Sequence, residues 1–188
     1  MTTSYYKKRI TLICFLALVL IALDQLLKIY VKTHFELGEA KIITSWFWIC
    51  FVENNGMAFG LEVFSKIILT IFRLAAMLLL LWYIILLFKL KIGDFKIRWG
   101  YLVCVVFIFS GAVGNILDSL FYGILWNYAP FFYGKVVDMF HFPLIHNSAG
   151  EVVFFRPVFN LADSFITCAV FAILIFYRED LNISLSKR

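Results

Sequence analysis

Two aspartates inside apolar stretches are the residues of this chain that could do chemistry. Asp163 interrupts the run VFNLADSFITCAVFAILIFY, residues 158–177, and no cation lies one helical turn away from it. A carboxylate placed there is protonated, bound to a transported ion, or paired with a second carboxylate. Asp138, in the apolar stretch KVVDMF, is the candidate partner. Two carboxylates in one site share a proton, so that one acts as acid and the other as base. Such a pair can activate water for attack on an amide bond.

Other nucleophiles and metal sites find less support in the sequence. Ser119 and Ser164 lie in or beside apolar segments that offer no His or Lys suited to act as their base. His34, His141 and His146 fall outside the apolar runs and show no HExxH or similar spacing, so the sequence predicts no zinc site.

The composition indicates an integral membrane protein that must position these carboxylates within or beside a bilayer. Hydrophobic residues make up 63% of the 188 residues and charged residues only 15%, whereas soluble domains carry about 25% charged residues. The net charge of +5 arises largely from basic residues beside apolar runs. That placement is typical of membrane topology and does not predict a nucleic-acid partner.

Four apolar runs are long enough to cross a membrane. They cover residues 10–30, 66–88, 99–118 and 158–177, each close to the roughly 20 residues that a spanning helix needs. The first run follows basic residues as a signal peptide would, but no small-x-small cleavage site follows it. We therefore expect a retained first helix.

Basic residues predict the orientation of these helices. They cluster at the amino end, in segment 89–98 and in the carboxyl-terminal tail, which places both termini in the cytoplasm by the positive-inside rule. Segments 31–65 and 119–157 then face outward. The first contains an Asn54-Asn55-Gly56 turn after a β-branched and aromatic run, which predicts a small sheet. The second is long and aromatic and is expected to be an interfacial loop.

These elements define the expected fold. We predict an all-α membrane protein of four transmembrane helices, with a small extracytoplasmic β-sheet between helices 1 and 2 and a long interfacial loop between helices 3 and 4. No internal repeat or low-complexity linker divides the chain, so residues 1–188 are expected to form one domain.

Each predicted helix carries a polar group at a similar depth. At a rise of about 1.5 Å per residue, Asp24, Arg73, Asn115 and Asp163 lie ~22–26 Å beyond the cytoplasmic basic residue next to their helix. This agreement predicts one shared polar site in the outer half of the membrane. Asp24 and Lys28 are i,i+4 neighbours, for which a structural ion pair is the simpler interpretation.

Five short motifs resemble, in order along the chain, those of the lipoprotein signal peptidase family, also called signal peptidase II. DQLLK is similar to the family's Asp-Gln-x-x-Lys, and NNGMAF to its Asn-x-Gly-x-Ala-Phe. GAVGNILD resembles Gly-x-x-Gly-Asn-x-x-Asp, while VVDMF and FNLADS resemble Val-Val-Asp-Phe and Phe-Asn-x-Ala-Asp-Ser. The five motifs cover nearly the whole chain and fall on the predicted four-helix topology.

The resemblance implies a membrane aspartyl endopeptidase with Asp138 and Asp163 as its catalytic pair. Its substrates would be prolipoproteins whose lipobox cysteine carries diacylglycerol, cleaved on the amino side of that cysteine. It also implies contact with membrane lipid, inhibition by globomycin-type peptides, no metal or organic cofactor, and a bacterial cytoplasmic (inner) membrane with the active site near the outer leaflet. We expect a monomer. The residues expected to bind substrate or to support the pair are Asp24, Lys28, Asn54, Gly56, Asn115, Asp118, Asn160 and Ala162.

Two departures from the family pattern affect this prediction. Ser119 follows Asp118, where the family has an arginine that would hold the substrate backbone. We hypothesise that Arg73 partly substitutes for it. The aromatic stretch LFYGILWNYAPFF, residues 120–132, lengthens the loop before Asp138. It is expected either to gate lipid entry or to pack as a plain insertion on the interface.

Two other classes of protein are alternatives to a peptidase. A small ion- or proton-coupled transporter also places charges within the membrane, but the cytoplasmic halves of these helices, such as ILLF and AILIFY, are uncharged. In a membrane scaffold, the polar groups would only hold helices together. Asp138→Asn separates a scaffold from a peptidase, because it stops proteolysis and leaves a scaffold largely intact.

Overall fold

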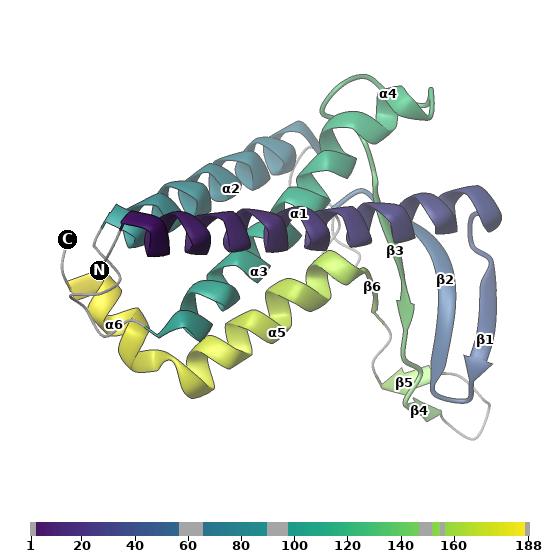
Figure 1. Cartoon of the computed structure of the whole chain (residues 1–188). Helices are drawn as coiled ribbons and strands as arrows, with labels where there is room; N and C mark the ends of the chain where they lie inside the picture. Colours follow the sequence, from purple (N-terminus) through teal and green to yellow (C-terminus); the bar gives the residue numbers. More distant parts are fainter. Residues whose placement is uncertain (1–2, 57–65, 90–97, 147–151, 155–156, 187–188) are drawn as a thin grey trace.

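The computed structural model describes residues 3–56, 66–89, 98–146, 152–154 and 157–186. Its main body is a bundle of four long helices, α1 (Thr3–His34), α2 (Lys66–Lys89), α3 (Trp99–Leu117) and α5 (Leu161–Phe176), with a small sheet at the end away from both termini (Figure 1). Helix α6 (Arg178–Ser186) follows α5 after a bend of 87°. Three helical segments among the described residues are long and apolar enough to span a membrane, or four if α5 and α6 count as one span.

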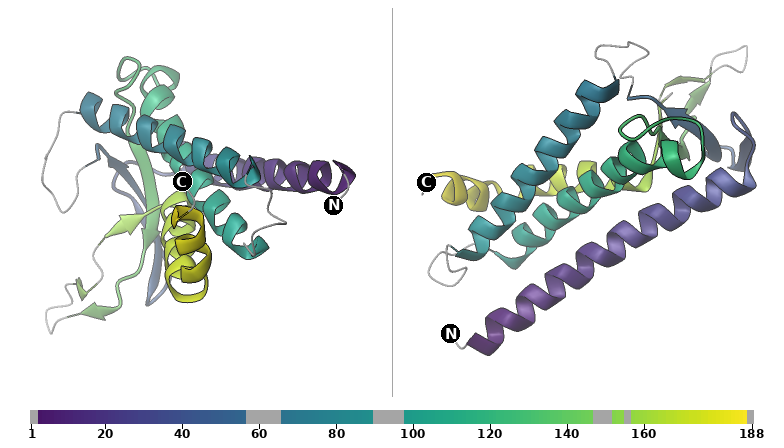
Figure 2. Two further views of the ribbon diagram at one scale, coloured as in Figure 1. Left: turned by 90° about the vertical axis from the view of Figure 1, so that its left-hand side faces the viewer. Right: turned by 90° about the horizontal axis from the view of Figure 1, so that it is seen from above.

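Helix α3 lies at the centre of the bundle, between α1 and α2 when the molecule is seen from above (Figure 2). Two glycines allow its neighbours to approach. A Cβ atom on Gly114 would lie 2.4 Å from an Asp24 carboxylate oxygen, and one on Gly111 would lie 2.5 Å from the Ala162 carbonyl oxygen. Small residues at helix contacts in membranes permit such close packing. They bring α1 and α5 against the same part of α3.

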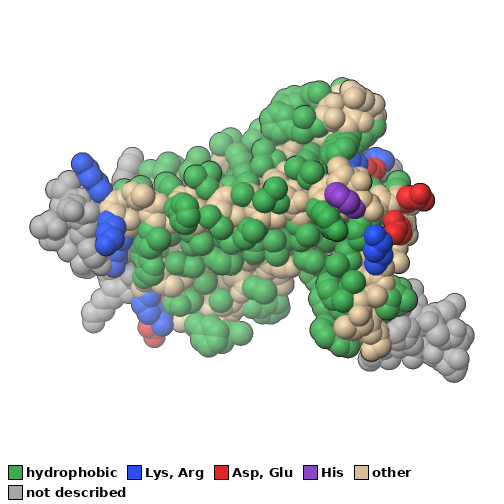
Figure 3. Space-filling view, turned by 45° about the vertical axis from the view of Figure 1, so that its right-hand side comes forward, with side chains coloured by type: hydrophobic (Ala, Val, Ile, Leu, Met, Phe, Trp, Pro, Cys, Tyr) green, Lys and Arg blue, Asp and Glu red, His purple; other side chains and the backbone are tan. Residues whose placement is uncertain are grey.

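The outer surface of the bundle is apolar over most of its length. Large hydrophobic side chains of α1, α2 and α5 are exposed there, including Phe15, Phe72 and Phe171 at 64%, 70% and 60% exposure. Figure 3 shows hydrophobic side chains over the visible face of the bundle and basic side chains at the end away from the sheet. A surface this apolar is expected to face lipid.

Three strands of the sheet come from the two loops that the sequence places outside the membrane, and the fourth comes from the start of the last apolar run. Its antiparallel order is β1-β2-β3-β6, from β1 (Ala40–Thr44), β2 (Phe47–Asn54), β3 (Val136–His141) and β6 (Val158–Phe159). Strands β4 (Ile145–His146) and β5 (Val152–Phe154) form a separate pair. The predicted sheet between helices 1 and 2 is confirmed, and β3 pairs Asp138 with Val52 of β2. The prediction of one interfacial loop for segment 119–157 was incomplete, because part of it completes this sheet.

The last helix begins later than its apolar run suggests. Val158 and Phe159 belong to β6, and Asn160 is the N-cap of α5. The predicted span over residues 158–177 therefore shortens to Leu161–Phe176. Asp163 consequently lies in the first turn of the helix and not in its interior.

Helix α3 continues through a π-helical turn, η1 (Asp118–Tyr122), into the short α4 (Gly123–Leu125). The turn buries Asp118, Ser119 and Tyr122 together. Single π-turns inside helices occur frequently at functional sites. Here the turn presents three polar side chains to the interior of the bundle.

The aromatic insertion folds back onto the ends of α2 and α3. The Gly134 amide donates to the Ser119 carbonyl oxygen at 2.9 Å, and the Thr70 hydroxyl donates to the Phe132 carbonyl oxygen at 3.0 Å. Phe121, Leu125 and Trp126 remain exposed on its outer side. These contacts hold the insertion against the ends of α2 and α3.

Candidate active site

Asp138 and Asp163 meet at the side chain of Asn160. The Asn160 amide nitrogen donates to Asp138 Oδ1 at 2.7 Å, while its carbonyl oxygen Oδ1 accepts from the backbone N–H of Asp163 at 3.0 Å. Asp163 Oδ2 in turn accepts from the Asn160 backbone N–H at 3.4 Å. This reciprocal pair of bonds is a capping box at the start of α5. One asparagine therefore holds both predicted catalytic carboxylates.

The second oxygen of Asp138 is held by the turn after β2. Asn54 Nδ2 donates to Asp138 Oδ2 at 2.9 Å, and Asn54 Oδ1 accepts from the Gly56 backbone N–H at 2.7 Å. Gly56 has φ +92°, and a Cβ atom there would overlap the side chain of Leu69. Glycine at this position thus permits the turn that orients Asn54 toward the carboxylate.

Asn115 on α3 connects Asp163 to a buried lysine. Its Nδ2 donates to Asp163 Oδ1 at 2.8 Å. Its Oδ1 accepts from Lys28 Nζ at 2.9 Å and from Asn160 Nδ2 at 3.2 Å. The lysine fixes which end of the Asn115 amide faces Asp163, because Nζ can only donate.

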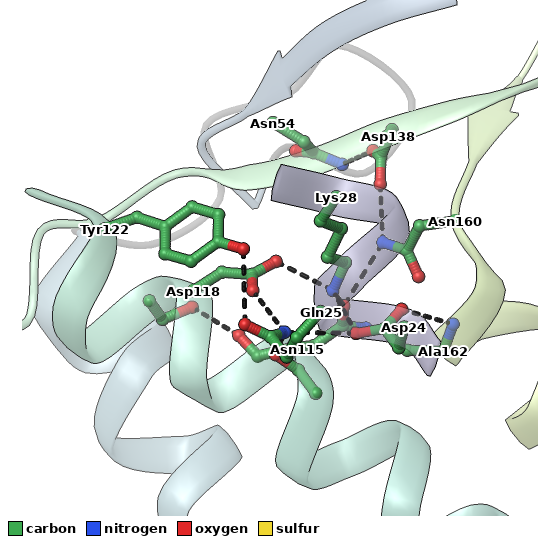
Figure 4. Close-up of polar contacts among 12 residues, drawn as sticks. Asp24, Gln25, Lys28, Asn54, Asn115, Asp118, Tyr122, Asp138, Asn160 and Ala162 are labelled. Atoms are coloured by element: carbon green, nitrogen blue, oxygen red, sulfur yellow. Dashed lines mark hydrogen bonds and ion pairs between the residues drawn. The ribbon is translucent and has the colours of Figure 1, made fainter. Parts of the chain in front are cut away.

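A buried cluster of charged side chains lies next to Asn115 and to the first turn of α5. Lys28 is 0% exposed and lies between two carboxylates, 2.9 Å from Asp24 Oδ2 and 2.7 Å from Asp118 Oδ2 (Figure 4). Asp24 Oδ1 accepts from the Ala162 backbone N–H at 2.9 Å, which ties α1 to the first turn of α5. The ion pair between Asp24 and Lys28 that the sequence predicts is present. It also contacts Asp118 of η1 and the backbone of α5.

All the predicted site residues join in one connected set of contacts. They are Asp24, Lys28, Asn54, Gly56, Asn115, Asp118, Asp138, Asn160, Ala162 and Asp163. Within this set, Asp138 and Asp163 are the carboxylates that no described lysine or arginine pairs with.

Gln25 and Tyr122 belong to the cluster but were not among the predicted residues. Gln25 Nε2 donates to Asp118 Oδ1 at 2.9 Å, and the Tyr122 hydroxyl donates to Gln25 Oε1 at 3.2 Å. Gln25 follows Asp24 in an apolar helix. A second polar residue at this depth was the sequence signal that could have placed it in the site. For Tyr122, its position four residues after Asp118 on the same helical face was the available signal.

Arg73 reaches the same region from α2. Its Nη1 donates to the Ser119 hydroxyl at 2.9 Å, and that hydroxyl donates to the Asn115 carbonyl oxygen at 3.0 Å. Asp163, Asp118 and Asp138 are the negative charges that act on the guanidinium. Among the described acidic residues, none forms an ion pair with Arg73. The side chain therefore lies beside Ser119, where the family pattern has its arginine.

Asp138 has an unusual affinity for its proton. Burial of this carboxyl raises its pKa to about 6, and the charge of Asp163 acts in the same direction. Hydrogen bonds from Asn54 and Asn160 oppose the rise by stabilising the carboxylate. A carboxyl group with a pKa near neutrality can serve as an acid or a base under physiological conditions.

Comparison with known proteins places this geometry in a family. A family model described as signal peptidase (SPase) II matches residues 16–178. The lipoprotein signal peptidase of Porphyromonas gingivalis is 37% identical over 194 residues, which cover 90% of this chain and 84% of the relative. That of Amoebophilus asiaticus is 33% identical, over 89% of this chain and 78% of the relative.

A solved structure shows the same fold. It is titled a bacterial membrane enzyme structure by the in meso method at 2.3 Å resolution, and it superposes with a TM-score of 0.67 at 24% identity. The superposition covers 95% of this chain and 93% of the other. Together with the family match over residues 16–178, these similarities identify the chain as a member of the signal peptidase II family.

Proposed function

We propose that Asp138 and Asp163 act as one catalytic pair that activates water to hydrolyse a peptide bond. As a signal peptidase II, the protein is an aspartic peptidase of bacterial membranes that removes signal peptides from prolipoproteins. The observation that carries the assignment of the pair is the side chain of Asn160, which hydrogen-bonds Asp138 and caps α5 together with Asp163.

The surroundings of each carboxyl suggest its role. Asp163 accepts hydrogen bonds at the amino end of a helix, where the helix dipole favours an anion. Burial raises the pKa of Asp138 to about 6, so this carboxyl can hold the proton of the pair. In the proposed first step, Asp163 takes a proton from water while the water oxygen bonds to the substrate carbonyl carbon, and Asp138 gives its proton to the carbonyl oxygen. In the second step, the C–N bond breaks as the leaving nitrogen takes the proton from Asp163, while one hydroxyl of the intermediate returns a proton to Asp138 and its oxygen re-forms the carbonyl.

The remaining predicted residues are proposed to support the pair. Asn54, Asn115 and Asn160 orient the carboxylates by direct hydrogen bonds. The salt-bridged cluster of Lys28 then holds Asn115 and, through Asp24, the first turn of α5. Gly56 and Ala162 contribute backbone geometry. No metal or organic cofactor enters this mechanism.

Several finer properties follow from the resemblance and from the charge pattern. We propose that the substrate cysteine carries diacylglycerol, that cleavage occurs on its amino side, and that globomycin-type peptides inhibit the enzyme. Both termini would be cytoplasmic, with the active site near the outer leaflet. The single domain over residues 1–188 would act as a monomer.

The function is tested with purified protein and two forms of one precursor. The diacylglyceryl-modified prolipoprotein should be cleaved on the amino side of its cysteine, as read by mass spectrometry of both products. The same precursor with an unmodified cysteine should remain intact. Cleavage of both forms at equal rates would contradict a requirement for the lipid.

Arg73 is proposed to hold a substrate carbonyl beside the pair. Arg73→Ala should lower kcat/KM by about tenfold to a hundredfold, the cost of a lost charge-assisted hydrogen bond. Arg73→Lys should recover part of the loss, because it keeps the charge but not the planar donor group. The kinetic constants of the two variants check this. A rate for Arg73→Ala equal to that of wild type would remove Arg73 from the mechanism.

The pH dependence of kcat/KM should reflect Asp138. Because its protonated form is required and its pKa is raised to about 6, kcat/KM should decline as the pH rises through that value. Asn54→Leu removes a hydrogen bond that stabilises the carboxylate, so the pKa should rise and the decline should move to higher pH. Glu53→Gln, a change to the neighbouring residue, serves as the control. A decline that stays in place in Asn54→Leu would contradict the assignment of the proton to Asp138.

A further inference from the structure

An apolar groove leads away from the catalytic pair between the sheet and α5. Its cavity has a volume of about 660 Å³. Such a volume lies in the usual range for small-molecule sites, about 300–1,000 Å³. The residues that line it are Phe47, Phe140, Phe142, Pro157, Phe159, Asp163, Ser164, Thr167 and Cys168.

One wall of the groove consists of aromatic rings from the sheet. The ring of Phe142 lies 5.0 Å from that of Phe47 and 5.7 Å from that of Phe159, between centroids. The ring of Phe140 lies 6.1 Å from that of Phe47 and 6.0 Å from that of Phe159. None of these side chains carries a hydrogen-bonding group, so the wall can recognise only apolar matter.

The other wall is one face of α5. Asp163 and Ser164 lie in its first turn, and Thr167 and Cys168 follow one turn later on the same side. The Ser164 hydroxyl already donates to the Asn160 carbonyl oxygen at 3.0 Å. Thr167 and Cys168 are exposed. The groove therefore starts at a catalytic carboxylate and opens sideways toward lipid.

We propose that this groove receives an acyl chain of the diacylglyceryl group on the substrate cysteine. The inference rests on the proposed function and deepens it. Only Cα and Cβ separate the nitrogen of the cleaved bond from the sulfur that carries the glycerol. The acyl chains therefore begin close to the catalytic pair and need an apolar space that continues into the bilayer, which the groove beside Asp163 supplies.

A peptide segment fits this groove less well. An extended peptide needs partners for its backbone N–H and C=O groups, usually from a free strand edge. The aromatic wall offers ring faces instead. An acyl chain needs no hydrogen-bond partners. Because the chain moves from lipid into a groove of similar polarity, burial of apolar surface adds little free energy, and the groove selects the chain by packing and position.

The experiment uses two substrates with one peptide sequence, whose cysteine carries either two palmitoyl or two butyryl chains on its glycerol. Thr167→Trp places a large side chain at the open side of the groove. It should lower kcat/KM for the long-chain substrate by about tenfold or more, the size of an overpacking penalty. The short-chain substrate should be cleaved within about twofold of the wild-type rate. Leu174→Trp is the control, because Leu174 is 50% exposed on the same helix and does not line the groove.

Each other outcome overturns the proposal in a recognisable way. An equal loss of kcat/KM for both substrates would show that the groove binds the peptide. No loss of kcat/KM for either substrate would show that the groove binds no part of the substrate and is filled by bilayer lipid. If thermal unfolding shows that Thr167→Trp does not fold, Phe142→Ala opens the aromatic wall and should impair only the long-chain substrate. A wild-type protein that cleaves neither substrate would refute the proposed function itself.

Discussion

Asp138→Asn is expected to lower the single-turnover rate of prolipoprotein cleavage by about a thousandfold or more, within the range assigned to a general acid or base. The amide cannot release a proton to the substrate carbonyl oxygen, and it cannot take part in sharing a proton with Asp163. Binding of the substrate should persist, because Arg73 and the groove beside Asp163 are unchanged.

The same variant should remain folded. Asn54 and Asn160 both donate to Asp138, and an asparagine there can still accept one of these bonds. Burial already disfavours the charged form of Asp138, so loss of the charge costs little stability. Thermal unfolding in detergent checks this point.

A matched control lies on the neighbouring strand. Glu53 pairs with Val137 in the sheet, next to Asp138, but its carboxylate binds Lys32 and Lys135. Glu53→Gln makes the same chemical change one position away and should leave the cleavage rate within about twofold, because the Glu53 carboxylate contacts Lys32 and Lys135 and not the catalytic pair. Asp138→Asn with a rate within tenfold of the Glu53→Gln rate would contradict a catalytic role for Asp138.

Lys28→Met is expected to destabilise the protein by about 3–5 kcal/mol, as removal of one partner from a buried ion pair does elsewhere. The lysine is 0% exposed and forms ion pairs with Asp24 and Asp118 at 2.9 and 2.7 Å. Methionine fills a similar volume, but it leaves both carboxylates buried without their cation. Cleavage should fall as well, because Asn115 loses the donor that orients it toward Asp163.

The control for this prediction is Lys41→Met. Lys41 is 52% exposed and lies 3.6 Å from Glu39, a surface pair for which a contribution of about 0–1 kcal/mol is usual. Denaturation of both variants in the same detergent compares the two changes in unfolding free energy. Equal small changes would show that the buried cluster does not hold the helices together.

The sequence predicted the helices and the polar site because both depend on local features. Apolar length located the spans, and the rise per residue put Asp24, Asn115 and Asp163 at one depth. The contacts confirm that convergence, since Asn115 bonds Asp163 and Asp24 bonds the backbone of Ala162. The family resemblance, and not the spacing, supplied the reaction.

The sheet was only partly predictable. The turn at Asn54-Asn55-Gly56 marked β2, but β3 joins it from far along the chain. Pairing between distant segments depends on tertiary context, which a local pattern does not contain. The stretch around Asp138 therefore looked like part of an interfacial loop.

The position of Asp163 shows how an available signal was missed. Asn160 followed three residues later by Asp163 is the pattern of an N-cap with an acidic residue that bonds back to it. The apolar residues Val158 and Phe159 extended the hydrophobic run past this boundary and hid it. The aspartate lies in the first turn of α5, directly after strand β6 of the sheet.

The central claim is that Asp138 and Asp163 form one catalytic unit, and a double-mutant cycle tests it most directly. Single-turnover rates would be measured for wild type, Asp138→Asn, Asp163→Asn and the double variant, with one diacylglyceryl-modified prolipoprotein. Residues that act as a unit have strongly non-additive effects. We predict that each single variant loses nearly all activity and that the double variant is no slower than either. Losses that multiply in the double variant, or a single variant that cleaves near the wild-type rate, would contradict the account.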